Sequence, residues 1–426
     1  MQIPGGLMVK WKLRRVHRRR SFRRTAWIAG GCVVAVLLWN NGIHNIGSIN
    51  AQGEADCLQP PARQTPSLPE VPEVDRSTLP DPTAITGPTT AYTQSGEIPP
   101  VSDTTEHEAN LPVTVASADG SRQTVKKTDR ILAMNQNGGI AAAVVGLGLG
   151  CKLVGRDIAT DFTQLVPGAE QLPLITQGGH EINAEAVLAL SPDVILTDST
   201  IGPYDAQMQL RNAGIPVIFI SSSYEEGVRS AGPQIREVAN ALGVPELGDK
   251  LAERTVREIN GTQEAVEKLA PEDPADRPRT VFLYLRGSIY YWFGVGSGAD
   301  SLIQSVSARD VAAEVGFKGM SPTNSEALIK AAPDIIIVMT LGLASVGGVD
   351  KALELPGIKQ TPAGENRRII DMSDYEVMSF GPRSAEVIAA LGTSIYAPEL
   401  AHHPDDPPES IDKRLKEINE ELDEDN

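Results

Sequence analysis

The sequence predicts an α/β protein made of two doubly wound α/β lobes that are joined by one long bridging α-helix, with a ligand cleft between the lobes. Three observations support this fold class. Short β-rich runs alternate with helical patterns from residue 130 to residue 398, which is typical of parallel sheets covered by helices. One long helical pattern lies in the middle of the chain, and a fourteen-residue motif occurs once on each side of it.

The predicted strands are short runs rich in β-branched residues. They are RILAM (130–134), VILTD (194–198), PVIFI (216–220), TVFLYL (280–285), DIIIVM (334–339) and RIIDM (368–372). Three of them precede the long helical pattern and three follow it. Each lobe is therefore expected to have a sheet of its own.

The bridging helix is expected over residues 245–273, PELGDKLAERTVREINGTQEAVEKLAPED. Glycine weakens a helix and proline ends one. We therefore expect an interruption at Gly261 and a stop at Pro271. The stretch contains no β-rich run, so it connects the two lobes rather than contributing to either sheet.

The repeated motif is NAEAVLALSPDVIL (183–196) in the first half and NSEALIKAAPDIII (324–337) in the second, and six of the fourteen positions are identical. Each copy starts with an Asn suited to cap a helix and has a Glu two positions later, near the positive end of the helix dipole. A capped helix followed by a strand is common in α/β proteins. The number of identities nevertheless favours a duplicated lobe.

The flanks of the chain differ from the lobes in composition. The first 25 residues hold nine Lys and Arg and no acid, and the apolar run AWIAGGCVVAVLLW follows. Such a run is shorter than the roughly 18 residues of a spanning helix and is typical of an export signal. We expect residues 1–50 to be a basic export signal or membrane anchor, 51–125 a Pro-rich and largely disordered linker, 126–244 the first lobe, 245–273 the bridging helix, 274–398 the second lobe, and 399–426 an acidic tail.

Charge and cysteine usage exclude several classes of function. The formal net charge is −17 although the N-terminus is basic, so a nucleic-acid partner is not expected. Cys151 is the one cysteine in the predicted lobes, which argues against a disulfide framework or a Cys-based zinc site. An anchored hydrolase or metal enzyme could use His180 with Glu181 and Asp198, but the chain has neither a GxSxG nor an HExxH motif. We expect no enzymatic activity.

The whole arrangement resembles the substrate-binding proteins of ABC importers for haem, siderophores and vitamin B12. Within that family, TQGGHEINAEAVLALSPDVIL and FLYLRGS are similar to the haem-binding lipoproteins of actinobacterial haem importers. The resemblance implies that His180 of the first lobe and Tyr284 of the second hold the iron of haem b, iron protoporphyrin IX, and that Arg286 supports the tyrosine. It further implies that Glu185 and Glu326 dock on the membrane subunits of an ABC permease.

His180 is the only histidine within the predicted lobes, because three of the six histidines precede them and two follow. Gly178 and Gly179 allow the backbone to turn sharply before it. It lies just before the helix cap at Asn183, in a loop of the kind that lines the ligand crevice of α/β lobes. A surface or hydrogen-bonding role is the alternative.

Tyr284 and Arg286 lie two residues apart near the end of a predicted strand, so both point to one face of the sheet. A guanidinium beside a phenol favours the phenolate, which is a good ligand for ferric iron. The aromatic side chains of Tyr290, Tyr291 and Trp292 could pack against a porphyrin or could simply be core.

Further pocket candidates are Met339, Tyr375 and Arg383, of which Arg383 could pair with a haem propionate; packing is the alternative for each. For Glu185 and Glu326 a helix-dipole role is compatible with docking.

The sequence thus predicts an extracytoplasmic haem-binding protein, tethered to the membrane by a lipid or an N-terminal anchor, that delivers haem to an ABC permease for import. A ferric siderophore or vitamin B12 binding protein of the same fold is the alternative. A haem scavenger that works without a permease is a further one.

Overall fold

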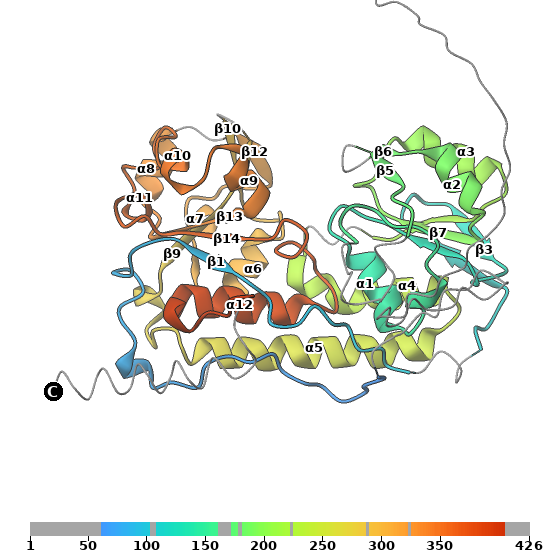
Figure 1. Cartoon of the computed structure of the whole chain (residues 1–426), viewed down its shortest axis with the longest axis horizontal. Coiled ribbons are helices and arrows are strands. Elements are labelled where there is room, and N and C mark those ends of the chain that lie inside the picture. The colour runs from blue at the N-terminus through green and yellow to red at the C-terminus, as the bar shows by residue number, and fades with distance from the viewer. Residues whose placement is uncertain are drawn as a thin grey trace, which may run out of the picture. The chain divides into compact units, whose positions relative to one another are not determined.

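The computed structural model describes residues 61–102, 108–160, 172–177, 181–221, 225–286, 289–322 and 325–404. The predicted signal or anchor over residues 1–50 lies outside this part of the chain, as does the acidic tail beyond residue 404. Within the described ranges no helix is both long and apolar enough to cross a membrane. Figure 1 shows an α/β lobe on each side and one long helix, α5, below them.

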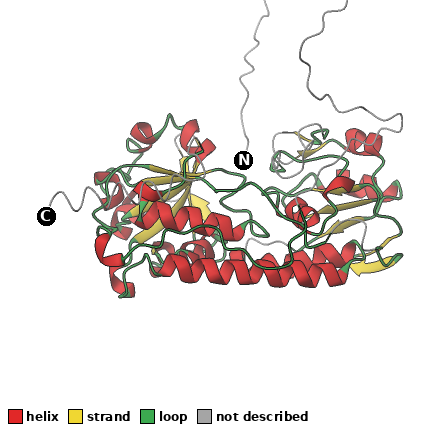
Figure 2. Ribbon diagram, turned by 60° about the horizontal axis from the view of Figure 1, so that its bottom comes forward, coloured by secondary structure: helices red, strands yellow, loops and turns green. Residues whose placement is uncertain are grey.

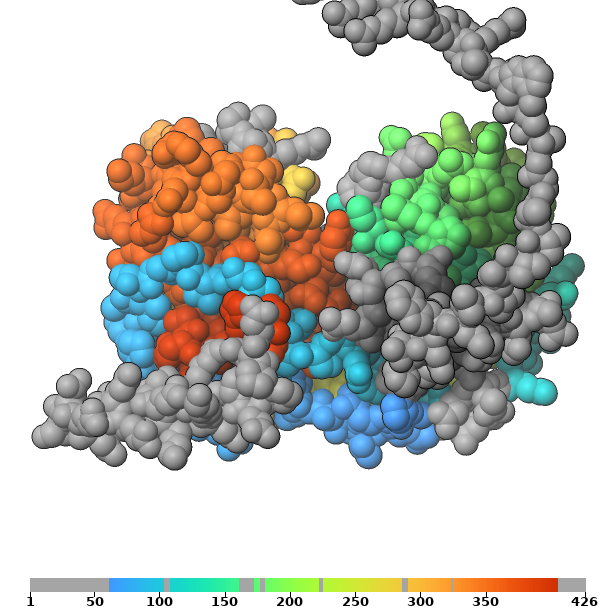
Figure 3. Space-filling model, viewed as in Figure 1, coloured from blue at the N-terminus to red at the C-terminus, as the bar shows by residue number. Residues whose placement is uncertain are grey.

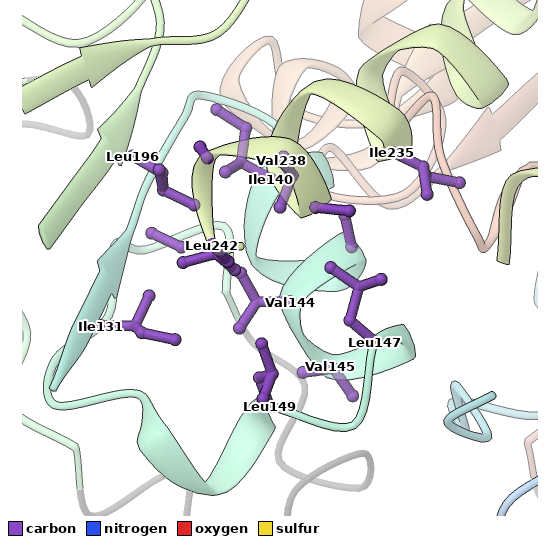
Figure 4. Close-up of a cluster of buried hydrophobic side chains, with 14 of the residues drawn as sticks. Ile131, Ile140, Val144, Val145, Leu147, Leu149, Leu196, Ile235, Val238 and Leu242 are labelled. Atoms are coloured by element: carbon purple, nitrogen blue, oxygen red, sulfur yellow. The ribbon is translucent and has the colours of Figure 1, made fainter. Parts of the chain in front are cut away.

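The first lobe is built on a parallel sheet with the order β4-β7-β8. These strands are Ile131–Ala133, Val194–Thr197 and Val217–Phe219, and all three were predicted. Helices α1 (Gly139–Gly146) and α4 (Ala231–Ala241) cover one face, and α2 (Ala184–Leu190) and α3 (Tyr204–Asn212) cover the other. Figure 4 shows the first of these two cores. The smaller elements of this lobe are β2 (Val113–Ala116), β3 (Arg122–Val125), η2 (Gly150–Lys152), β5 (Thr176–Gln177), β6 (Glu181–Ile182) and η4 (Gly227–Ser230).

The second lobe has a mixed sheet with the order β1-β14-β13-β9-β10-β12. Strands β9 (Arg279–Arg286), β13 (Ile335–Met339) and β14 (Ile369–Met372) are parallel and were predicted. Strand β10 (Ile289–Phe293) runs antiparallel to both of its neighbours, β9 and β12 (Met320–Pro322). The aromatic run of the sequence is therefore a hairpin. The other elements here are η5 (Pro274–Asp276), α6 (Ala299–Ser305), β11 (Arg309–Asp310), α7 (Val311–Glu314), α8 (Ser325–Ala331), α9 (Thr340–Ser345), α10 (Val349–Ala352), α11 (Pro362–Glu365), α12 (Ser384–Tyr396) and η6 (Pro398–Leu400).

The bridging helix α5 runs from Pro245 to Glu267 without a break, as Figure 2 shows. It packs on α4 of the first lobe and on α12 of the second. The interruption predicted at Gly261 is wrong. A Cβ atom at this position would come within 2.8 Å of Leu68, so the glycine marks the place where another part of the chain crosses the helix closely.

That crossing segment is residues 61–102, which the sequence predicted to belong to a disordered spacer. This prediction is wrong for these residues, which pack along both lobes (Figure 3, blue and cyan). Strand β1 (Thr89–Ala91) extends the second sheet beside β14. Ile98 and Val101 are buried in the core of the first lobe. Proline is compatible with an extended edge segment of this kind, because such a segment needs few backbone donors.

The repeated motif folds in the same way in both lobes. Each helix, α2 and α8, buries an aliphatic residue, Val187 or Leu328. Each is followed by a residue with positive φ, Ser191 (46°) or Ala332 (43°). The aspartate that follows the proline then accepts a bond from the backbone N–H of an arginine at the start of the neighbouring strand. These bonds are Arg130 N–Asp193 Oδ2, 3.0 Å, and Arg279 N–Asp334 Oδ2, 2.8 Å.

A buried polar network lies where the strands of the first lobe end. The Asp157 carboxylate accepts bonds from the backbone N–H of Asn135 (2.8 Å) and from Thr160. The side chain of Asn135 donates to that of Asn137 (2.6 Å), which donates to the carbonyl of Met378 in the second lobe (2.7 Å). The network therefore joins the two lobes directly.

We expect Ile98→Ala to lower the free energy of unfolding by about 2–5 kcal/mol, because it removes a side chain that is only 2% exposed from the first core. Leu68→Ala on the same segment is the matched control, since Leu68 is 49% exposed and its loss should cost under about 1 kcal/mol. Denaturant titration measures both. Equally small effects would mean that the segment is a solvated spacer after all.

We expect Asp157 to make stability depend on pH. Burial raises the pKa of its carboxyl from 3.8 to about 6, against the opposing hydrogen bonds from Thr160 and Asn135. The folded chain then holds this proton more tightly than the unfolded chain does, so the group stabilises the fold below about pH 4 and loses that effect as the pH rises through about 6. In Asp157→Asn, the free energy of unfolding should differ less between pH 5 and pH 7 than it does in the parent protein. The exposed Asp205→Asn is the control; an unchanged difference in Asp157→Asn would contradict the raised pKa.

Candidate functional site

The carboxyl ends of the parallel strands of the two lobes meet. Asn137 follows β4, Met378 follows β14, and the bond between them joins these two edges. Gly139 and Phe380 also approach closely, since a Cβ atom on Gly139 would lie 3.2 Å from the Phe380 carbonyl. Figure 3 shows the surface hollowed between the two lobes. Loops at the carboxyl ends of strands form the ligand crevice in α/β folds.

In the first lobe, strands β5 and β6 form a short hairpin at this edge. The backbone N–H of Ile182 donates to the carbonyl of Gly202, in the loop that follows β7 (2.8 Å). Ile175, next to β5, donates to Arg156 (3.0 Å). Residues 178–180 lie between the two strands in the sequence, and the candidate ligand His180 is outside the described residues. The two strands that precede and follow residues 178–180 are thus placed at the carboxyl edge of the sheet.

The predicted cap of α2 is present, because the side chain of Asn183 accepts a bond from the N–H of Ala186 (3.1 Å). The backbone of Asn183 in turn donates to the carbonyl of Ile175 (3.1 Å). This links the start of the helix to the base of the β5–β6 hairpin. The cap therefore fixes the hairpin as well as the helix.

In the second lobe, Tyr284 lies near the carboxyl end of β9. Tyr291 is its partner across the hairpin, and their ring centroids are 6.1 Å apart. Met339 ends the neighbouring strand β13 and packs, like Tyr284, against the core that includes Phe282 and Phe293. All three side chains are half-buried. Tyr291, Tyr284 and Met339 therefore form a row across three strands on one face of the sheet.

Two of the predicted pocket residues lie on the opposite face of the same sheet. Tyr290 and Trp292 are buried with Leu283 and Leu285 in a separate core, and the Tyr290 hydroxyl donates to the Pro356 carbonyl (2.6 Å). Side chains alternate along a strand, so these two cannot share a surface with Tyr284. Of the aromatic run, Tyr291 stays with the candidate site.

Arg286 is the last residue of β9, and its backbone pairs with Ile289 across the hairpin. The side chain of Arg286 is outside the described part of the structure. Its backbone lies two residues after Tyr284 in the same strand.

Arg383 was predicted as a possible partner for a carboxylate of the ligand, but it already pairs with a carboxylate of the protein. The Arg383 guanidinium is buried and forms an ion pair with Glu376. Glu376 also accepts a bond from Thr93 of the 61–102 segment (2.9 Å). Tyr375, the neighbour of Glu376, is half-buried in the loop after β14. Arg383 therefore holds this loop in place, a role that its sequence context did not reveal.

Glu185 and Glu326 lie in the first turns of α2 and α8, respectively, and both are exposed. Neither takes part in an ion pair among the described residues. Their carboxylates are therefore presented to solvent at equivalent points of the two lobes.

The polar residues Asn135, Asn137 and Asp157 at the junction were not predicted from the sequence. The run MNQNGG directly after the first strand was the available signal, because polar residues at the end of a buried strand face the crevice. Cys151 is disulfide-bonded, a single bond that the cysteine count, which argued against a disulfide framework, did not predict. Nowhere in the described ranges do three or more His, Cys, Asp or Glu residues gather as a metal site would require.

Comparisons with known proteins agree with this architecture. Residues 137–376 match the model of a family described as periplasmic binding protein. The solved structure of the haem-binding protein HmuT is 35% identical, covers 75% of this chain and 100% of its own, and has a TM-score of 0.68. The periplasmic haem-binding protein RhuT from Roseiflexus sp. RS-1 is 32% identical, with 64% and 99% covered and a TM-score of 0.57. A cobalamin-binding protein of Halobacterium salinarum is 22% identical over 296 residues, which is 68% of this chain and 76% of that protein.

Solved variants of HmuT replace a histidine, a tyrosine and an arginine with alanine. The tyrosine and the arginine lie two positions apart there, as Tyr284 and Arg286 do here. The family model covers more than half of this chain, and the relatives named above are binding proteins by their descriptions. On these grounds, the chain belongs to the periplasmic binding protein family.

Proposed function

We propose that this protein captures haem between its two lobes outside the cytoplasm and delivers it to an ABC permease for import. The observation that carries the proposal is the likeness to HmuT, a haem-binding protein, over the full length of that chain at 35% identity. The family implies an extracytoplasmic location. Attachment by a lipid or by the N-terminal apolar run completes the proposal.

His180 and Tyr284 would bind the iron, one from each lobe, with Arg286 stabilising the tyrosinate. Support comes from the position of Tyr284 near the carboxyl end of β9, and from the β5–β6 hairpin, whose two strands precede and follow residues 178–180. Tyr291 and Met339, in the same row as Tyr284, offer an aromatic ring and a thioether to one porphyrin face. The bound group is proposed to be haem b.

The residues present suit a ferric porphyrin better than a chelated ion. The chelating groups of a siderophore already fill the coordination sites of its iron. A tyrosinate from the protein would then have no iron site to occupy. A cobalamin-binding protein is among the relatives, at 22% identity, and cobalamin therefore remains the second candidate. A titration of the purified protein with cyanocobalamin and with haemin separates the two.

We expect the purified full chain to show a Soret band when haemin is added, and Tyr284→Phe to weaken its haem affinity more than about ten-fold, because the phenolate oxygen is the ligand. His180→Ala should also shift the band. Tyr290→Phe is the matched control, since its hydroxyl lies on the other face of the hairpin and bonds to Pro356. A Soret band that is unchanged in both Tyr284→Phe and His180→Ala would contradict the proposal that these two residues bind the haem iron.

We expect the paired charge reversals Glu185→Lys and Glu326→Lys to reduce haem uptake by cells while leaving the Soret titration unchanged, because exposed charges at a docking face fix orientation and encounter. Glu246→Lys is the control, because Glu246 is likewise exposed in the first turn of a helix, α5. It can interact with the helix dipole as Glu185 and Glu326 do, but it is not part of the proposed docking face. Unimpaired uptake in the double variant would favour a scavenger that works without a permease.

A further inference from the structure

The loop that joins β14 to α12, residues 373–383, forms the second lobe's side of the junction. The carbonyl of Met378 accepts the bond from the side chain of Asn137 in the first lobe (2.7 Å). Val377, Met378 and Phe380 are buried in the core of the second lobe, so apolar contacts hold the middle of the loop. Because the loop lies outside the sheet and the helices, its course also depends on the polar side chains that bind it.

Glu376 binds this loop to its surroundings. Its carboxylate forms an ion pair with the guanidinium of Arg383 at the far end of the loop. It also accepts a bond from the Thr93 hydroxyl of the 61–102 segment (2.9 Å). Glu376 therefore connects the two ends of the loop to each other and to a segment that packs on both lobes.

The turn that presents Met378 begins at Glu376. The backbone N–H of Ser379 donates to the Glu376 carbonyl (2.9 Å), so these two residues enclose Val377 and Met378. A displacement of Glu376 therefore also moves the carbonyl that accepts the bond from Asn137.

The ion pair is largely shielded from water, because the side chains of Arg383 and Glu376 are only 8% and 19% exposed. Polar interactions are stronger in such surroundings than at an open surface. Loss of one partner would leave the other charge buried without compensation. The position of the turn is therefore sensitive to the charge of Glu376.

We propose that Glu376 is a positioning residue of the ligand cleft. Bound to Arg383 and Thr93, it holds the Met378 carbonyl where Asn137 reaches it, and so keeps the two lobes at the spacing in which haem is retained. This inference rests on the proposed function and adds to it a control of ligand release. The 61–102 segment contributes to haem retention through Thr93.

The test is the rate at which haem passes from the loaded full chain to an excess of apomyoglobin. Glu376→Gln keeps the shape of the side chain but removes the charge that compensates Arg383, and it should raise the rate of haem release about ten-fold. Thr93→Val removes one hydrogen bond and leaves the ion pair, and it should raise the rate about three-fold. The Soret maximum of both variants should stay at the position of the parent, because the proposed iron ligands are unchanged.

Glu354→Gln is the matched control, because Glu354 forms an ion pair with Lys351 in the same lobe (2.9 Å) but at an exposed surface. Its rate of haem release should equal that of the parent. Asn137→Ala removes the bond to Met378 directly and should raise the rate by a factor similar to that of Glu376→Gln. Because Glu376 acts through this bond, the double variant should release haem no faster than the faster of the two single variants.

Release rates of Glu376→Gln and Thr93→Val that equal that of Glu354→Gln would overturn the inference. Factors that multiply in the double variant would overturn it as well, because Glu376 would then act independently of the bond between the lobes. Thermal unfolding checks that each variant is folded; if Glu376→Gln is not, the rate of Thr93→Val decides. A parent chain that shows no Soret band with haemin would overturn the proposed function itself, on which the inference rests.

Discussion

The direction of the strands is the constraint on which the rest of this structure depends. Parallel strands all end at one edge of their sheet, and here the two edges are joined by the bond from Asn137 to the Met378 carbonyl. Whatever side chains follow the strands must then meet at the junction. This is why the polar network of the first lobe lies at that junction, and why Tyr284 and Met339 lie near the carboxyl ends of their strands.

Two connections besides this bond restrain the lobes. Helix α5 packs on both, and the segment 61–102 pairs β1 with the second sheet while it buries Ile98 and Val101 in the first core. A large hinge rotation would pull one end of this segment out of its site. Motions that open and close the cleft are therefore expected to be small, and ligand release would require an external force on both lobes, which a partner bound to each lobe can supply.

The predicted and observed structures differ for physical reasons that can be located. All six predicted strands are present, because a short run of β-branched residues between two helical patterns favours a strand over a helix. Strand β10 was not among the predicted strands, although the alternation of Tyr290 and Trp292 with Tyr291 and Phe293, which separates two faces, was the available signal. The prolines of segment 61–102 predict a disordered spacer. No local signal shows that the few apolar residues of this segment fit into two distant cores. The same packing explains Gly261, which composition alone marks as a helix breaker.

The two lobes carry matching side chains on the exposed faces of their repeated helices, but different side chains near the carboxyl ends of their strands. The exposed faces of α2 and α8 carry similar residues at equivalent positions of the motif, Glu185 with Glu326 and Leu188 with Ile329. Near the carboxyl ends of the strands the first lobe has amides and a buried carboxyl, and the second has phenols and a thioether. The repeat is therefore preserved on the outer faces of the two helices, whereas the strand ends carry a different set of side chains in each lobe.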